Sequence, residues 1–198
     1  NNLYTQGSPL LIAAGALLKD NQTSTILAQI KFRSLSNKEI KAIKVHIKAF
    51  DVSGAEVQGV EEYQYLDLSV SRNKEFGQKT AIPLPDAVTR SFSVVCTSVI
   101  FLDNTIWKAE KDAVWEPLPK QQNLENSVGD LAQQYRRDTS PQSCFEPLEY
   151  RDVWFCSCGA VNKRGESQCC SCGVSRRTVF SVLNTDLLTQ NQAQFEAE

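Results

Sequence analysis

Histidine is almost absent from this chain. The single histidine, His46, alternates with Lys44 and Lys48, which places it on the outward face of a predicted strand. Histidine is the most frequent general base and a common ligand in catalytic metal sites. Glycine-rich phosphate loops and the nucleophile elbow of hydrolases are also missing. We therefore expect a protein that is not an enzyme.

Long apolar runs and methionine are lacking too. The best candidate run, Leu10–Leu18, is interrupted by Gly15 and has no basic segment before it. A bilayer requires roughly 20 apolar residues, so this run predicts neither a transmembrane helix nor a signal peptide. The absence of methionine, even at position 1, favours a piece of a longer protein. Membrane attachment through segments beyond this sequence therefore stays open.

Neither basic nor acidic residues are in large excess. The chain has 21 basic and 23 acidic residues and a net charge of −2, so no global field attracts nucleic acid or an anionic membrane. The length of 198 residues, 41% of them hydrophobic, is ordinary for a globular protein of one or two domains.

Cysteine, in contrast, is present and clustered. Five of the 7 cysteines fall between positions 156 and 172. An odd number, mostly in one cluster, favours a metal site in a reducing compartment such as the cytoplasm over a disulfide framework. Of the other two, Cys96 is expected to be a small buried side chain on a strand, and Cys144 a loop thiol.

The clustered cysteines suit zinc. A structural Zn²⁺ site takes four thiolates in a tetrahedron, about 2.3 Å from the metal. We choose Cys156, Cys158, Cys169 and Cys172 as the ligands of one zinc ion per chain. Cys170 stays an alternative to Cys169, because its spacing to Cys172 would mirror that of the first pair. Such a closed site is structural, since it leaves no position for substrate.

Residues 8–116 are predicted to form a β-sandwich domain. Ile26, Ile30 and Phe32 recur with period 2, which is typical of a half-buried strand. Further strands are predicted over 45–49, 63–70, 92–102 and 105–107, with edge strands over 10–18 and 80–84. About seven short strands favour two packed sheets. Strand count and spacing resemble an immunoglobulin-like sandwich, although its paired inter-sheet cysteines are absent.

Residues 117–150 are predicted to be a proline-flanked linker with a helix over 123–137. Leu124, Val128, Leu131 and Tyr135 would share one face of this helix. Asn123 is a suitable cap for its start. We expect this apolar stripe to dock on the sandwich, the alternative being a partner-binding helix. Residues 139–147 are then expected to be a linker with little to bury.

A zinc knuckle over 151–175 and a tail over 178–198 complete the predicted organisation. In the tail, Asn184-Thr185-Asp186 is a helix-start signal. The predicted architecture is thus mainly β: a sandwich, a linker helix, a small zinc-ribbon-like knuckle and a C-terminal helix.

The knuckle resembles the nuclear-pore, Ran-binding-protein type of zinc finger over about 20 residues. The likeness lies in Trp154-x-Cys156 and in Cys158-x3-Asn162-x6-Cys169-x2-Cys172. The family has at least two residues between the first two ligands, whereas this chain has only Ser157. Small bacterial zinc ribbons with a Trp-x-Cys-x-Cys-Gly element look closer in this respect. The resemblance implies that Asn162 braces the second turn and that Trp154 covers the metal site.

Some members of that finger family bind single-stranded RNA, and this supplies an alternative function. Trp154 would stack on a base, and four basic residues would contact phosphates: Lys163, Arg164, Arg176 and Arg177. The competing interpretation makes Trp154 the knuckle's own core and the basic residues its solvated face. The ubiquitin-binding Thr-Phe pair is missing, because Val179 follows Thr178. We expect a non-catalytic binding or scaffold protein whose knuckle supports a protein–protein interaction.

Overall fold

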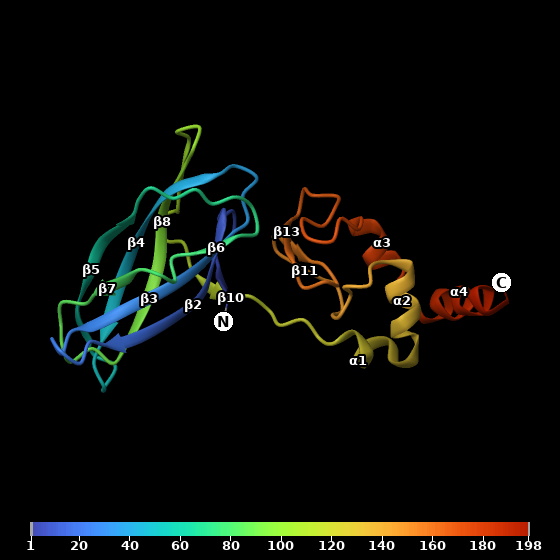
Figure 1. The fold of residues 1–198 in the computed structure, drawn as a ribbon, viewed down its shortest axis with the longest axis horizontal. Coiled ribbons are helices and arrows are strands. Elements are labelled where there is room, and N and C mark those ends of the chain that lie inside the picture. The colour runs from blue at the N-terminus through green and yellow to red at the C-terminus, as the bar shows by residue number, and fades with distance from the viewer. Residues whose placement is uncertain (1, 198) are drawn as a thin grey trace. The chain divides into compact units, whose positions relative to one another are not determined.

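The computed structural model describes residues 2–197 and is mainly β, with helices in the C-terminal part (Figure 1). The chain divides into two compact units, one running to Leu118 and the other starting at Pro119. Among the described residues, no helix has the length and apolar character needed to cross a membrane.

The first unit contains two antiparallel sheets. One has the strand order β10-β1-β2-β3-β6, with β7 also paired to β3, and the other has the order β5-β4-β8-β9. The strands of the first sheet are β1 (Leu3–Tyr4), β2 (Leu10–Lys19), β3 (Ile26–Ser34), β6 (Glu75–Phe76), β7 (Ala81–Pro83) and β10 (Glu116–Pro117). Those of the second are β4 (Ile40–Phe50), β5 (Glu56–Tyr65), β8 (Ser91–Phe101) and β9 (Ile106–Lys108).

The inner faces of both sheets share one core, which confirms the predicted sandwich. Alternate residues of β3, among them Ile30 and Phe32, are buried together with Ile43 and Ile47 of β4. Phe32 also packs edge-on to Tyr65, with ring centroids 5.4 Å apart. Each fully buried side chain of this kind contributes about 1.5–3 kcal/mol. The finer likeness to an immunoglobulin-like sandwich stays a prediction.

The strand predicted over 63–70 is placed differently. β5 covers Glu56–Tyr65, and the chain leaves it before Asp67, whose φ is +53°. The pairing with β4 shifts register on either side of Ile47, and Gly59 lies at this irregularity. A Cβ on Gly59 would stand 2.2 Å from the carbonyl oxygen of Ile47. The sequence prediction missed residues 56–62, the first part of β5, because a glycine and several polar residues obscure the period-2 pattern there.

Of the two strands predicted at sheet edges, β7 keeps an edge position, whereas β2 lies between β1 and β3 in the sheet. β2 pairs with β3 along its length, but its other side meets β1 only where Leu3 lies opposite Ile12. β7 pairs with β3 through Ala81–Pro83, and a proline suits such an edge position.

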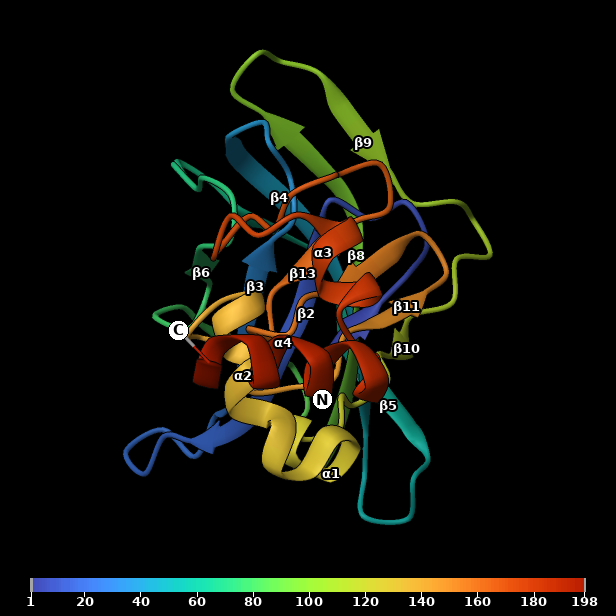
Figure 2. The same ribbon diagram turned by 90° about the vertical axis from the view of Figure 1, so that its right-hand side faces the viewer.

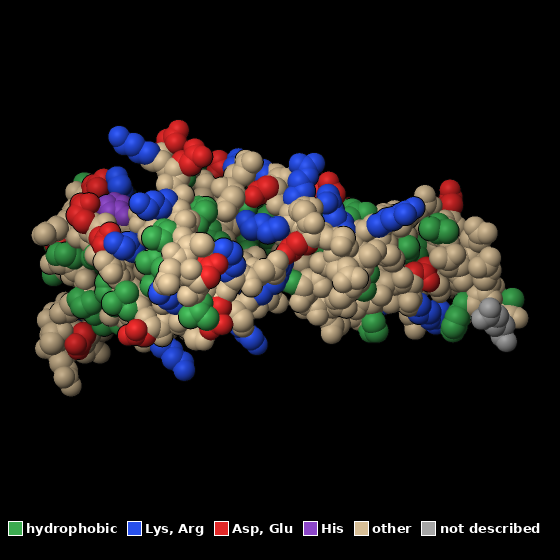
Figure 3. All heavy atoms as spheres, turned by 90° about the horizontal axis from the view of Figure 1, so that it is seen from above, with side chains coloured by type: hydrophobic (Ala, Val, Ile, Leu, Met, Phe, Trp, Pro, Cys, Tyr) green, Lys and Arg blue, Asp and Glu red, His purple; other side chains and the backbone are tan. Residues whose placement is uncertain are grey.

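Charges on the first unit are mixed rather than segregated. Figure 3 shows basic and acidic side chains interspersed over the face that it draws. Several of them pair, as Lys44 does with Glu62 at 3.0 Å and Lys38 with Asp103 at 2.7 Å. This arrangement agrees with the near-neutral composition, and it leaves no broad field of one sign on this face.

The second unit combines a small sheet with short helices. Its antiparallel sheet has the order β11-β12-β13. The strands are β11 (Leu148–Tyr150), β12 (Val153–Phe155) and β13 (Val161–Lys163), and the helical segments are α1 (Leu124–Val128), the 3₁₀ turn η1 (Gly129–Leu131), α2 (Ala132–Asp138), α3 (Arg176–Ser181) and α4 (Thr185–Ala197). Figures 1 and 2 show α4 beside α2.

The helix predicted over 123–137 exists but is interrupted. Gly129, the first residue of η1, has a φ of +55° and ends α1. Asn123 occupies the cap position without a side-chain capping bond. The apolar stripe is buried within the second unit, where Leu124 and Tyr135 cluster with Leu188 of α4. The expected docking of this stripe on the sandwich is therefore replaced by packing on the C-terminal helix, which starts where Asn184 predicts it.

Residues 139–147 are not the loose linker that their composition suggests. The backbone N–H groups of Cys144 and Phe145 both donate to the carbonyl oxygen of Ser157, at 2.8 and 2.9 Å. Ser143 is fully buried, and its hydroxyl lies 2.8 Å from that of Ser157. The prediction failed because backbone hydrogen bonds, which carry no sequence signature, hold this segment.

Candidate metal centre

The first two cysteines of the cluster sit in the turn between two strands. β12 ends at Phe155 and β13 begins at Val161, so Cys156 and Cys158 lie in the connection between them. The amide of Cys156 donates to the Ala160 carbonyl at 2.9 Å. Gly159, with a φ of +88°, allows the chain to reverse there. The turn therefore directs the thiols of Cys156 and Cys158 to the same side of the chain.

The second pair sits in a turn of similar form. The amide of Cys169 donates to the Val174 carbonyl at 2.9 Å, and the amide of Gly173 donates to the Cys169 carbonyl at 3.0 Å. Gly173 has a φ of +75°, again the left-handed conformation that closes such a turn. The side chains of Cys169 and Cys172 thus both project from this one turn.

The four sulfurs converge. The Sγ atoms of Cys156, Cys158, Cys169 and Cys172 all lie within 4.8 Å of one another. Two of the separations, Cys156 to Cys172 and Cys158 to Cys169, are 3.6 Å. Tetrahedral ligation at 2.3 Å from a metal requires sulfurs about 3.8 Å apart, whereas a disulfide requires about 2.0 Å. The cluster has the dimensions of a metal site, and its cysteines are free thiols.

Cys170 stands outside this group. Its sulfur lies 3.8 Å from the carbonyl oxygen of Val161, and it is not among the four convergent sulfurs. The structure thus brings together the set that contains Cys169, which is the set chosen from the sequence.

Asn162 connects the two turns. It is fully buried on β13, and its side-chain oxygen accepts a hydrogen bond from the Cys170 amide at 2.8 Å. Its side-chain nitrogen points to the sulfur of Cys169 at 3.8 Å and to the Ala160 carbonyl at 3.2 Å. Asn162 therefore braces the second turn, as the finger resemblance implies.

Trp154 belongs to the interior of the module. Its side chain is 0% exposed, and its indole nitrogen donates to the Glu166 carbonyl at 3.1 Å. It clusters with Cys156, and its ring meets that of Phe180 edge-on at 6.3 Å. A base cannot stack on a ring that is fully covered, so this structure removes Trp154 from the predicted binding surface.

The electrostatics of the cluster favour a cation. Hydrogen bonds from the thiols of Cys156 and Cys158 lower the pKa of the Cys169 thiol, whereas hydrogen bonds to Cys158 and Cys169 raise the pKa of Cys156. Like charges only a few ångströms apart oppose full ionisation of the set. A bound dication removes this conflict, because metal binding expels the protons from coordinating thiols.

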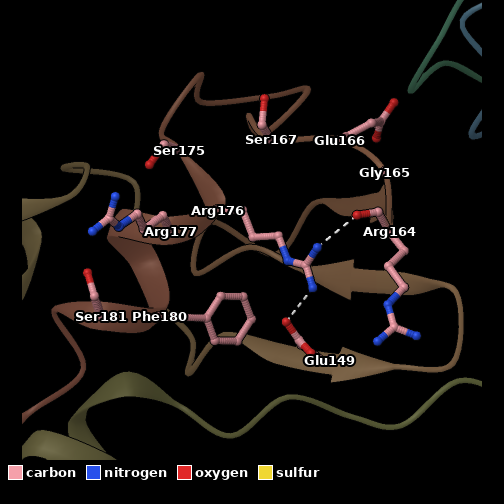
Figure 4. Close-up of a pocket in the computed structure, with 10 residues that line it drawn as sticks. All are labelled: Glu149, Arg164, Gly165, Glu166, Ser167, Ser175, Arg176, Arg177, Phe180 and Ser181. Atoms are coloured by element: carbon pink, nitrogen blue, oxygen red, sulfur yellow. Dashed lines mark hydrogen bonds and ion pairs between the residues drawn. The ribbon is translucent and has the colours of Figure 1, made fainter.

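The four basic residues of the predicted surface have different environments. Arg176 donates to the Glu149 carboxylate at 2.5 Å and to the Arg164 carbonyl at 2.8 Å (Figure 4). Lys163 lies 3.9 Å from the carboxylate of Asp152. Arg164 and Arg177 have exposed side chains. Half of the predicted basic surface is thus engaged with acidic neighbours.

Sequence reasoning missed the helix α3, which closes the module. Ser175 caps it by accepting a hydrogen bond from the Thr178 amide at 3.0 Å, and Val179 is fully buried beside the cysteines. The hydroxyl of Tyr135 donates to the Val179 carbonyl at 2.8 Å and so ties α2 to α3. The capping serine before Arg176 was the available signal, but six residues are too few to show a helical period.

The comparisons with known proteins supply no function. No family model and no curated protein matches the chain. A solved structure of a hypothetical protein from Peptoclostridium difficile 630 is 12% identical, covers 52% of this chain and 88% of its own, and has a TM-score of 0.41. A DUF1425 family member from Shewanella sp. pv-4 is 16% identical, covers 48% and 84% respectively, and has a TM-score of 0.35. Likenesses this weak support no argument about either unit.

Proposed function

We propose that the second unit is a small binding module held together by one structural zinc ion, within a non-catalytic binding or scaffold protein. The observation that carries this proposal is the convergence of four cysteine sulfurs from two separate turns. All four tetrahedral positions are thereby filled by protein, so the ion would serve the fold rather than a reaction.

The size of the unit explains why a metal would be needed. Among its described residues, two hydrophobic clusters contain five buried residues each, and one of these clusters includes two of the cysteines. A core this small contributes little stability by itself. Structural zinc contributes on the order of 10–16 kcal/mol in comparable peptides, which is enough to fix such a module as a rigid surface for a protein partner. The same thiolate chemistry favours a reducing compartment such as the cytoplasm.

Elemental analysis of the purified chain tests the proposal. We expect close to one zinc per chain, lost in Cys158→Ser and retained in Cys170→Ser, which changes a neighbouring thiol outside the group. Iron in place of zinc would reject the identity of the metal, because a four-thiolate tetrahedron accepts either ion. Retention of metal by Cys169→Ser and its loss in Cys170→Ser would reject the ligand set.

A further inference from the structure

A groove lies beside the metal centre, between α3 and the turn that follows β13. It has a volume of about 680 Å³, within the range of ligand-binding pockets. Figure 4 shows Phe180 near its middle, beside Arg176 and Glu149. The lining of the groove includes Glu149, Arg164, Glu166, Arg176, Arg177 and Phe180. Because the groove lies next to the cysteine-bearing turns, a bound metal would fix the conformation of its lining.

Two cationic groups at this groove have no partner. Within residues 2–197, the guanidinium groups of Arg164 and Arg177 make no hydrogen bond or ion pair, and both side chains are exposed. In Figure 4 they lie on opposite sides of Phe180 and Arg176. Arg176, in contrast, is held by Glu149 at 2.5 Å. The groove therefore offers two separate positive charges flanking a neutral ion pair.

An apolar surface lies between these charges. The ring of Phe180 is half-buried, and one side of it packs on the buried indole of Trp154. This contact fixes the ring from behind and leaves part of it facing the groove. A rigid aromatic surface of this kind is a favourable anchor for an apolar side chain of a partner.

From this arrangement we infer that the groove binds a short acidic peptide segment, with an apolar side chain on Phe180 and carboxylates on Arg164 and Arg177. The inference rests on the proposed function and names the partner class of that module. Charge complementarity supports it, since three arginines and only two glutamates line the groove. Arginine pairs with a carboxylate through two parallel hydrogen bonds, which fixes the orientation of the peptide.

Two carboxylates in the groove disfavour a nucleic acid as the occupant. Glu149 and Glu166 both line it, and the Glu166 carboxylate is anchored by the Lys163 amide at 2.8 Å. A phosphate backbone carries one negative charge per nucleotide and would meet these carboxylates directly. A peptide can instead place neutral residues opposite them. The covered face of Trp154 also deprives a base of its platform.

Fluorescence anisotropy of the full chain with a labelled peptide tests the inference. The probe is a capped peptide of alternating glutamate and leucine, and its counterpart has lysine in place of glutamate. We expect the acidic probe to bind and the basic one not to bind. Arg164→Ala combined with Arg177→Ala should weaken binding at least about tenfold, because it removes two charge-assisted pairs.

A matched control removes two charges elsewhere. Lys111 and Lys120 are exposed and do not line the groove, so Lys111→Ala combined with Lys120→Ala should leave binding within about twofold. Equal binding by both double variants, or no binding by the unaltered chain, would overturn the inference. Binding of labelled poly-uridine RNA without binding of the acidic peptide would overturn it in favour of a nucleic-acid surface. Zinc content measured on each sample separates these outcomes from failure of the metal centre, which would appear as a chain without zinc.

Discussion

At the scale of single residues, Asn162 joins the two cysteine-bearing turns of the candidate site. Its side chain contacts both turns and the sulfur of Cys169. The sequence already indicated this residue, because the finger resemblance gives an asparagine at that offset a bracing role. Residues that orient metal ligands in this way affect metal affinity although they do not touch the metal.

Replacing Asn162 by alanine should therefore weaken zinc binding by about 10–100-fold without abolishing it. Competition with a chromogenic chelator measures this affinity. Asn126, an exposed residue on α1, supplies the control, and Asn126→Ala should leave the affinity unchanged. An unchanged affinity in Asn162→Ala would show that the second turn holds its shape without the brace.

Two buried tyrosines should respond in opposite ways to loss of their hydroxyl groups. Tyr135 donates to the Val179 carbonyl, one of the last carbonyls of α3, which lacks a partner within that helix. Tyr135→Phe should destabilise the second unit by about 1–3 kcal/mol, because a buried acceptor is left unsatisfied. Among the described residues, the buried hydroxyl of Tyr65 has no partner, and burial raises its pKa. Tyr65→Phe should leave the first unit as stable or make it more stable.

Urea unfolding followed separately for the two units measures both effects. Circular dichroism in the far ultraviolet follows the strands of the sandwich together with the helices of the second unit, whereas zinc release follows the second unit alone. The unfolding of the sandwich is therefore the change in circular dichroism that occurs without zinc release. A loss of stability in Tyr65→Phe as large as that in Tyr135→Phe would mean that the Tyr65 hydroxyl has found a partner, such as a buried water.

At the scale of elements, the accuracy of the sequence predictions depended on how each element is stabilised. β3 was predicted well because its burial alternates with period 2 along its whole length. β8 was predicted from its run of β-branched residues, although its alternation shifts at Ser98 and Val99. The first half of β5 was missed where Gly59 accommodates an irregular pairing with β4. α3 was missed because its six residues are held by a capping serine and by tertiary contacts rather than by an amphipathic period.

The same dependence on how each element is stabilised explains which parts of the candidate site could be predicted. Cysteine spacing and flanking glycines predicted the turns, since a metal site requires particular residue types at particular offsets. The sequence offered Trp154 both as the core of the module and as a binding surface, and its full burial supports the core. One of the contacts on its ring comes from Phe180, on the unpredicted helix. The groove was out of reach because α3 supplies Arg177, Phe180 and Ser181 to it.

At the scale of the whole molecule, the two units have different sources of stability. The first has a large apolar core that draws on both sheets. The described residues of the second include two small clusters, and under our proposal a metal adds to its stability. Since the units divide at Leu118 and Pro119, each is expected to unfold as its own cooperative transition.

Differential scanning calorimetry should accordingly resolve two transitions. A strong chelator should abolish the one that belongs to the second unit, since the structural metal supplies a large part of its folding free energy. The transition of the sandwich should keep its midpoint. A chelator that shifts both transitions together, or neither, would contradict the assignment of the metal to one unit. Cys158→Ser without chelator provides the matching comparison.

The single residue between Cys156 and Cys158 has an evolutionary consequence. The carbonyl oxygen of Ser157 accepts hydrogen bonds from two backbone amides, and its hydroxyl forms a hydrogen bond with that of Ser143. The turn and the segment 139–147 are therefore joined by three hydrogen bonds. An insertion that lengthened this turn to the spacing of the nuclear-pore fingers would break all three contacts at once. We therefore expect that homologues with a single residue between these two cysteines also keep residues 143–145.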